Sequence, residues 1–231
     1  MKLKGWLAAI ALMSTGAAMA QHQDVEVGVE DGALVIENGL QMLNGGVLFE
    51  AEFGELGEPF GTDDPGFEVD DGLFQAGEIL AFQAIGTLQM WDGNAWTSAD
   101  ISPIQIAAMD VLGNETLWDG AGTVNPMGFI DGADDEGGIH SHVEFEIQDS
   151  LGGTPMPGAF MIELALFGMA ADQTTQVYDA SQSMFVAFNL GLDESVFEMA
   201  VDAALVPIPG AAIFMLSGLL SMFGISRRKT A

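Results

Sequence analysis

Short segments in which polar and apolar residues alternate follow one another through most of the chain. Residues 24–29 read Asp, Val, Glu, Val, Gly, Val, the pattern of a strand with one buried face. Gly-, Pro- and Asp-rich stretches separate such segments, and we interpret the two longest, 54–77 and 120–138, as loops. Further strands are predicted at 33–36, 47–53, 78–84, 87–91, 104–112, 139–147, 160–167 and 184–189. The pattern predicts an all-β body, an antiparallel sandwich or barrel.

One short helix is predicted after the last of these strands. Ser195 and Glu198 have the S-x-x-E spacing of a capping box, in which each side chain bonds the backbone N–H of the other residue. Apolar residues recur behind it at helical spacing, at 196, 197, 200, 201 and 204. We expect this helix to pack on the sheet and to lead into the C-terminal segment.

The N-terminus has the three parts of a secretory signal peptide. Lys2 and Lys4 form a basic start, residues 5–17 are mostly apolar, and Ala18-Met19-Ala20 is a small-residue cleavage site. We therefore assign residues 1–20 to a signal peptide and expect the mature chain to begin at Gln21.

The C-terminus is a second apolar segment with a basic end. Residues 206–226 contain no charged side chain, and Arg227, Arg228 and Lys229 follow directly. About 20 apolar residues span a bilayer as a helix, and cations beyond it hold that end in the cytoplasm. This predicts a single transmembrane helix within 206–231, with residues 21–205 forming an acidic, β-rich extracytoplasmic domain.

This tail resembles the PEP-CTERM sorting signal of Gram-negative bacteria. Val206, Pro207 and Pro209 match a Val-Pro-x-Pro form of its proline motif, with Ile208 where the named motif has Glu, and Arg227 and Arg228 match its arginine cluster. The resemblance implies export by the Sec translocon, anchoring in the inner membrane facing the periplasm, and transfer by exosortase to the cell surface or extracellular matrix. A plain single-pass anchor is the alternative.

Charge is distributed very unevenly. The chain has 34 Asp and Glu against 5 Lys and Arg, and all five basic residues lie in the two terminal segments. A body without Lys or Arg cannot neutralise phosphates, so nucleic acid is excluded as a partner. The chain has 0 Cys, which excludes disulfides, thiol catalysis and thiolate metal sites.

The sequence offers little for catalysis, and we expect that the protein is not an enzyme. No carboxylate pair can be singled out for glycoside hydrolysis. Ser141 would point away from His140 and His142 in a strand, which removes the one serine triad that can be drawn. A third hypothesis, a metal-dependent hydrolase, would need turnover that a chelator abolishes.

The 3 histidines provide the candidate metal ligands. In a strand, His140, His142 and Glu144 share one face, together with Glu146. His22 and Asp24 share a face of the first strand, and all three histidines would meet if the two strands were neighbours. Imidazole and carboxylate ligands suit zinc, and equally copper, nickel or iron. The alternative is that these are exposed polar residues without a ligand.

Two acidic loops, 62–72 and 131–138, offer clustered oxygen ligands for calcium, although neither has the spacing of an EF-hand. Solvated loops are the alternative. A calcium role would make the protein a non-catalytic matrix component whose carboxylates bind Ca²⁺ and exopolysaccharide.

The body also resembles a family of exported PEP-CTERM proteins, first noted in cyanobacteria, that the zinc-uptake regulator represses. The matching pieces follow one another in order: His22 with Asp24, 49–55, 62–67, 88–92, His140-Ser-His142, 159–167 and 185–189. The resemblance implies a role in zinc handling with these histidines as ligands. Two functions therefore remain open, zinc binding and an acidic matrix role.

Overall fold

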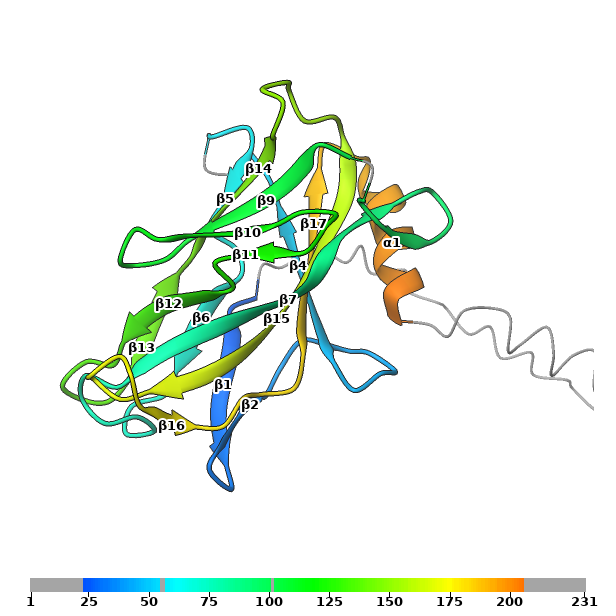
Figure 1. Ribbon diagram of the computed structural model, residues 1–231. Coiled ribbons are helices and arrows are strands. Elements are labelled where there is room, and N and C mark those ends of the chain that lie inside the picture. The colour runs from blue at the N-terminus through cyan, green and yellow to red at the C-terminus, as the bar shows by residue number, and fades with distance from the viewer. Residues whose placement is uncertain (1–22, 55–56, 101, 206–231) are drawn as a thin grey trace, which may run out of the picture.

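The computed structural model describes residues 23–54, 57–100 and 102–205, and these form three β-sheets and one helix. Figure 1 shows their arrangement. The signal peptide, His22 and the whole predicted sorting segment lie outside this range. No helix within it is long and apolar enough to cross a membrane.

The largest sheet has eight strands. Its main path runs β12, β7, β15, β17, β4, β3, and β8 and β16 pair with β7 and β15. The bounds are β12 (Met127–Gly132), β7 (Ile79–Trp91), β15 (Gly158–Met169), β17 (Met184–Leu190), β4 (Val47–Glu52), β3 (Leu40–Gln41), β8 (Trp96–Ser98) and β16 (Gln176–Tyr178).

Two smaller sheets complete the fold. A five-stranded sheet has the order β11 (Thr123–Val124), β10 (Glu115–Trp118), β9 (Ile104–Met109), β14 (Glu144–Asp149) and β5 (Gly61–Thr62). A four-stranded sheet has the order β13 (Ile139–His142), β6 (Gly66–Val69), β1 (Val25–Glu30) and β2 (Ala33–Ile36). The all-β prediction is confirmed. The sheets are not purely antiparallel, however, because β1 pairs with β6 and β17 with β4 in parallel.

One apolar core takes side chains from all three sheets. Phe67 of the four-stranded sheet, Phe145 of the five-stranded sheet and Phe188 of the eight-stranded sheet are each at most 1% exposed. The rings of Phe145 and Phe188 lie 5.3 Å apart. Burial of each such ring contributes roughly 1.5–3 kcal/mol. The smaller sheets are thus held against the large one by shared aromatic packing.

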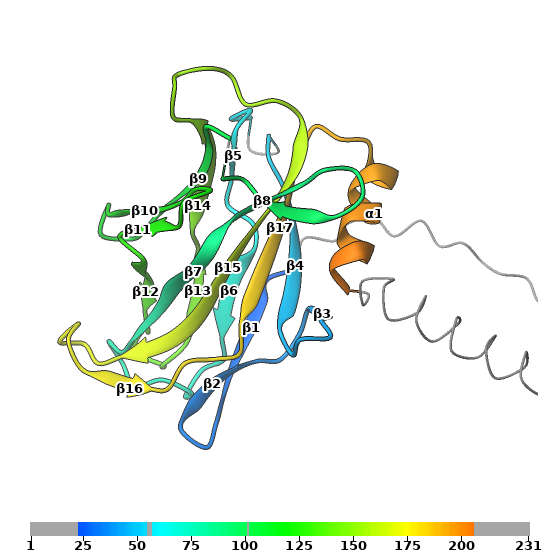
Figure 2. The same cartoon turned by 45° about the vertical axis from the view of Figure 1, so that its right-hand side comes forward.

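Helix α1 (Glu194–Leu205) covers part of the outer face of the eight-stranded sheet, beside β17 and β4 (Figure 2). Phe197, Ala200 and Val201 are buried there, and the Trp96 indole N–H donates to the Ala200 carbonyl at 2.8 Å. The helix begins at Glu194, two residues earlier than a cap at Ser195 predicts. The Asp193 carbonyl accepts from Val196 N at 2.8 Å, so Asp193 is the capping residue and the Ser195 capping box was wrong.

Four other segments also differ from the prediction. Segments 78–84 and 87–91 are one strand, β7, which passes through Gly86 at φ 68° where its register with β15 shifts. The supposed loop 120–138 contains β11 and β12, and the supposed loop 54–77 contains β5 and β6. The segment 139–147 is interrupted at buried Val143, where the chain leaves one sheet and enters another.

Candidate metal centre

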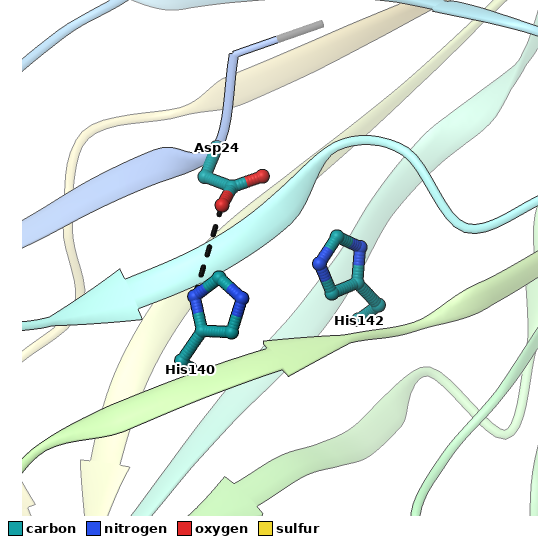
Figure 3. Close-up of side chains that lie close together, drawn as sticks. All are labelled: Asp24, His140 and His142. Carbon is teal, nitrogen blue, oxygen red and sulfur yellow. Dashed lines mark ion pairs between the residues drawn. The ribbon is translucent and has the colours of Figure 1, made fainter.

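The outer face of the four-stranded sheet brings Asp24, His140 and His142 together (Figure 3). One ligand atom from each lies within 4.8 Å of the others. Asp24 directly precedes β1, and both histidines are on β13. These two strands are not neighbours, because β6 lies between them.

The register across β6 accounts for this convergence. His142 is paired with Gly66 from one side, and Val25 is paired with Phe67 from the other, which places Asp24 beside Gly66. Because side chains alternate along a strand, the buried faces of these strands enter the core and the polar residues face outward together. The sequence prediction of a shared strand face thus holds for His140 and His142.

Gly66 leaves the space that the ligand atoms occupy. A Cβ atom built at Gly66 would lie 2.6 Å from Asp24 Oδ1, 2.6 Å from His142 Cε1 and 2.9 Å from His142 Nε2. No side chain can therefore be added at this position without moving the aspartate and the histidine. The backbone of β6 forms the floor of the centre.

The remaining geometry is open and partly solvated. His140 Nδ1 lies 3.8 Å from Asp24 Oδ2, and the two imidazole rings are 5.4 Å apart at 77°. One nitrogen of each ring faces the space between the rings (Figure 3). A tetrahedral zinc with ligands at about 2.0–2.1 Å holds them roughly 3.4 Å apart, so ligand atoms that lie within 4.8 Å of one another need only a small closure on binding. Exposed side chains such as His140, at 64%, can do so by rotation.

Hydrogen bonds from outside the sheet fix the Asp24 backbone. The Asn38 amide donates from Nδ2 to the Asp24 carbonyl at 2.7 Å, and Asn38 Oδ1 accepts from Glu26 N at 3.1 Å. These two bonds hold the chain on either side of Val25. Asn38 was not singled out from the sequence, since an Asn in a turn carries no signal of such a role.

The structure does not place the other two predicted ligands, Glu144 and His22, in this centre. Glu144 opens β14, where it is opposite Met109 of β9, and it belongs to neither of the candidate ligand groups formed by the described residues. Glu144 is exposed as predicted, but it is not on one strand with His140 and His142, because the chain passes from β13 into β14 of another sheet at Val143. His22 lies outside the described residues, so its meeting with the other two histidines stays a prediction.

A second group shares His142. Asp63 and Asp64, in the turn between β5 and β6, also have ligand atoms within 4.8 Å of this histidine. His142 Nδ1 lies 2.9 Å from the Asp63 carbonyl oxygen and 3.9 Å from Asp63 Oδ2. The sequence had placed these aspartates in a candidate calcium loop, without any link to a histidine.

The two acidic loops of the sequence lie side by side next to this centre. Gly72 N donates to the Glu136 carbonyl at 2.9 Å, which joins the loops directly. Between them is an open hollow of about 500 Å³ that includes His140 in its wall. Its acidic lining residues are Glu68, Asp70, Asp71 and Asp134.

Asp134 has a structural role in this hollow. Its Oδ1 accepts from Glu136 N at 3.0 Å and from Gly138 N at 3.1 Å, which closes the turn before β13. The carboxylate that orders the loop thus also adds to the negative charge beside His140.

The chain was also compared with known proteins. No protein-family model matches it, and no curated protein matches it significantly.

Proposed function

We propose that this protein is an exported surface protein that binds a transition metal, with zinc as the leading ion, through Asp24, His140 and His142. One observation carries the proposal: three candidate ligand side chains from two separate parts of the chain converge beside a glycine that leaves room for them. Two imidazoles and one carboxylate suit zinc, copper, nickel or iron. His22, two residues before Asp24, is the proposed fourth ligand.

The proposed act is binding rather than catalysis. Each of the three ligands is at least partly exposed, and the surrounding carboxylates attract cations and repel anionic substrates. With no Lys or Arg between residues 5 and 226, the body has no permanent cation to hold a phosphate or carboxylate group.

Export and sorting are proposed from the terminal segments alone. The signal peptide implies the Sec translocon, and the PEP-CTERM-like tail implies exosortase, with an inner-membrane precursor and a final place at the cell surface. Pulse–chase labelling of the full-length chain tests this: two successive decreases in mass support it, and a persistent C-terminal segment favours a plain anchor.

Metal content tests the binding proposal. We expect about one zinc or copper ion per chain, by mass spectrometry, in protein purified from the exported full-length chain. His140→Ala/His142→Ala should abolish it. Ser141→Ala is the matched control, because Ser141 lies between the two histidines and its hydroxyl points to the Ile130 carbonyl, away from the centre. No transition metal in any of these proteins would sink the proposal.

A second function is favoured by the meeting of the two acidic loops. An acidic matrix protein would bind Ca²⁺ and exopolysaccharide through the hollow lined by Asp70, Asp71 and Asp134. Calorimetry separates the two functions: many weak calcium ions that are unaffected by the histidine substitutions support the matrix role.

A further inference from the structure

His142 belongs to two candidate groups that lie on different sides of its ring. The first contains Asp24 and His140, and the second contains Asp63 and Asp64. An ion on one side is held by a different nitrogen from an ion on the other side. The tautomer of His142 therefore decides between the two groups.

The hydrogen-bond partner of His142 indicates which of its nitrogens carries the proton. Its Nδ1 is 2.9 Å from the Asp63 carbonyl oxygen. A carbonyl oxygen can only accept, so Nδ1 must be the donor, and in the neutral ring Nε2 is then the bare nitrogen. Metal-binding histidines commonly have their other nitrogen held in this way.

The Asp63 carbonyl is held in place from both sides. Thr62, at the end of β5, is 1% exposed, and its hydroxyl accepts from Asp64 N at 3.3 Å. Gly66 then begins β6, directly opposite His142. The acceptor thus lies in a short connection between β5, which pairs with β14, and β6, which pairs with β13 and β1, and this limits its movement away from the ring.

The bare nitrogen lies on the Asp24 side. Nε2 and Asp24 Oδ1 both lie within 2.9 Å of the position that a Gly66 Cβ would take. We propose that the main-chain carbonyl of Asp63 fixes His142 as an Nε2 ligand, which places the ion on the Asp24–His140 side and leaves the Asp63 and Asp64 carboxylates outside its coordination sphere. This inference rests on the proposed metal function, but its first test does not require any metal.

Long-range ¹H–¹⁵N correlation spectra of histidine-labelled protein identify the protonated nitrogen directly. The spectra are recorded without metal at about pH 8, above the ordinary histidine pKa of about 6.5. The His142 signals are assigned by their loss in His142→Ala. We expect a protonated Nδ1 and a bare Nε2. A protonated Nε2 on His142 would overturn the inference even if zinc binds.

Zinc titration of the same sample gives the second test. The Nε2 signal of His142 should move on binding while Nδ1 keeps its proton, and loss of the Nδ1 proton would overturn the inference. If zinc does not bind, the proposed function fails, and the metal-free tautomer still decides the role of the Asp63 carbonyl.

Two substitutions separate a ligand from a positioning residue. Asp63→Ala keeps the main-chain carbonyl, so it should leave the tautomer unchanged and weaken zinc binding by about 10-fold or less. Asp24→Ala removes a direct ligand and should weaken binding by at least about 100-fold. A loss in Asp63→Ala that equals or exceeds the loss in Asp24→Ala would overturn the inference, and a clearly larger loss in Asp63→Ala would place the ion on the Asp63 side.

Discussion

The eight-stranded and the four-stranded sheets bury their residues in different ways. In β15, Ile162 and Leu164 enter the central core, while Ala159 and Met161 on the opposite face pack under α1. All seven residues of β17 are buried. In β13, by contrast, only one face enters the core, and His140 and His142 are exposed on the other. A strand that is covered on both sides can stabilise the fold, but a candidate site needs a strand with one free face.

The largest expected effect lies in the doubly covered sheet. Phe188 is 0% exposed and lies 5.0 Å from Phe53 and 5.3 Å from Phe145, so Phe188→Ala should lower the free energy of unfolding by about 3–5 kcal/mol. His140→Ala, on the free face, should change it by no more than about 0.5 kcal/mol. Urea unfolding of the metal-free proteins measures both values. Similar losses in the two variants would contradict the contrast between the sheets.

The next prediction concerns the floor of the candidate centre. Gly66→Ala should weaken zinc binding by about 10-fold or more, because the new Cβ displaces Asp24 Oδ1 and His142 Nε2. Both are ends of movable side chains, so the loss of stability should be small. The substitution removes no ligand, and isothermal calorimetry with zinc measures its effect.

Gly132→Ala is the matched control for this change. Gly132 is an exposed strand glycine whose added Cβ would have no neighbour nearer than 4.0 Å. Zinc affinity should stay as in the unchanged protein. If Gly66→Ala also binds zinc normally, the convergence over Gly66 is not the binding site.

Much of the doubly covered sheet was predictable from the sequence, and much of the candidate site was not. Apolar runs such as 160–167 and 184–189 indicate buried strands wherever they occur. The strand β6 was missed because it is four residues long and is surrounded by Gly, Pro and Asp, which are typical of loops. Gly66 gave no signal of its role, because its importance depends on which strands lie on either side of it.

The candidate ligands show the same division. His140 and His142 were predicted from spacing alone, since positions i and i+2 of a strand share a face. Asp24 was predicted as a ligand. Its place beside His142, however, depends on the pairing of β6 with both β1 and β13, and no local sequence pattern predicts such long-range pairing. Exposed and buried residues continue to alternate through Val143 and Glu144, but the chain passes from the four-stranded to the five-stranded sheet there, and no local pattern indicates that change of sheet.

The smallest expected effect compares a carboxylate in a turn with the carboxylate at the centre. In the turn between β15 and β16, Asp172 accepts from Thr174 N at 2.8 Å, Thr175 N at 2.9 Å and the Thr175 hydroxyl at 2.8 Å. These donors, the Thr174 N–H first, lower the pKa of Asp172 from 3.8 to about 2. The ionised Asp172 carboxylate thus has its hydrogen-bond donors within the turn. The Asp24 carboxylate, by contrast, lies 3.8 Å from Nδ1 of His140.

The sign of the pH dependence follows from this lowered pKa. A carboxyl group with a depressed pKa in the folded state stabilises the protein above its unfolded pKa, and the contribution is lost as the pH falls from about 3.8 through about 2. Carboxyl ¹³C NMR should give a midpoint near 2 for Asp172, and Asp172→Ala should leave zinc affinity unchanged at pH 7. A midpoint near 3.8 would show that the turn does not hold this carboxylate. A loss of zinc affinity in Asp172→Ala would show instead that negative charge anywhere on the surface, rather than the convergence over Gly66, governs metal binding.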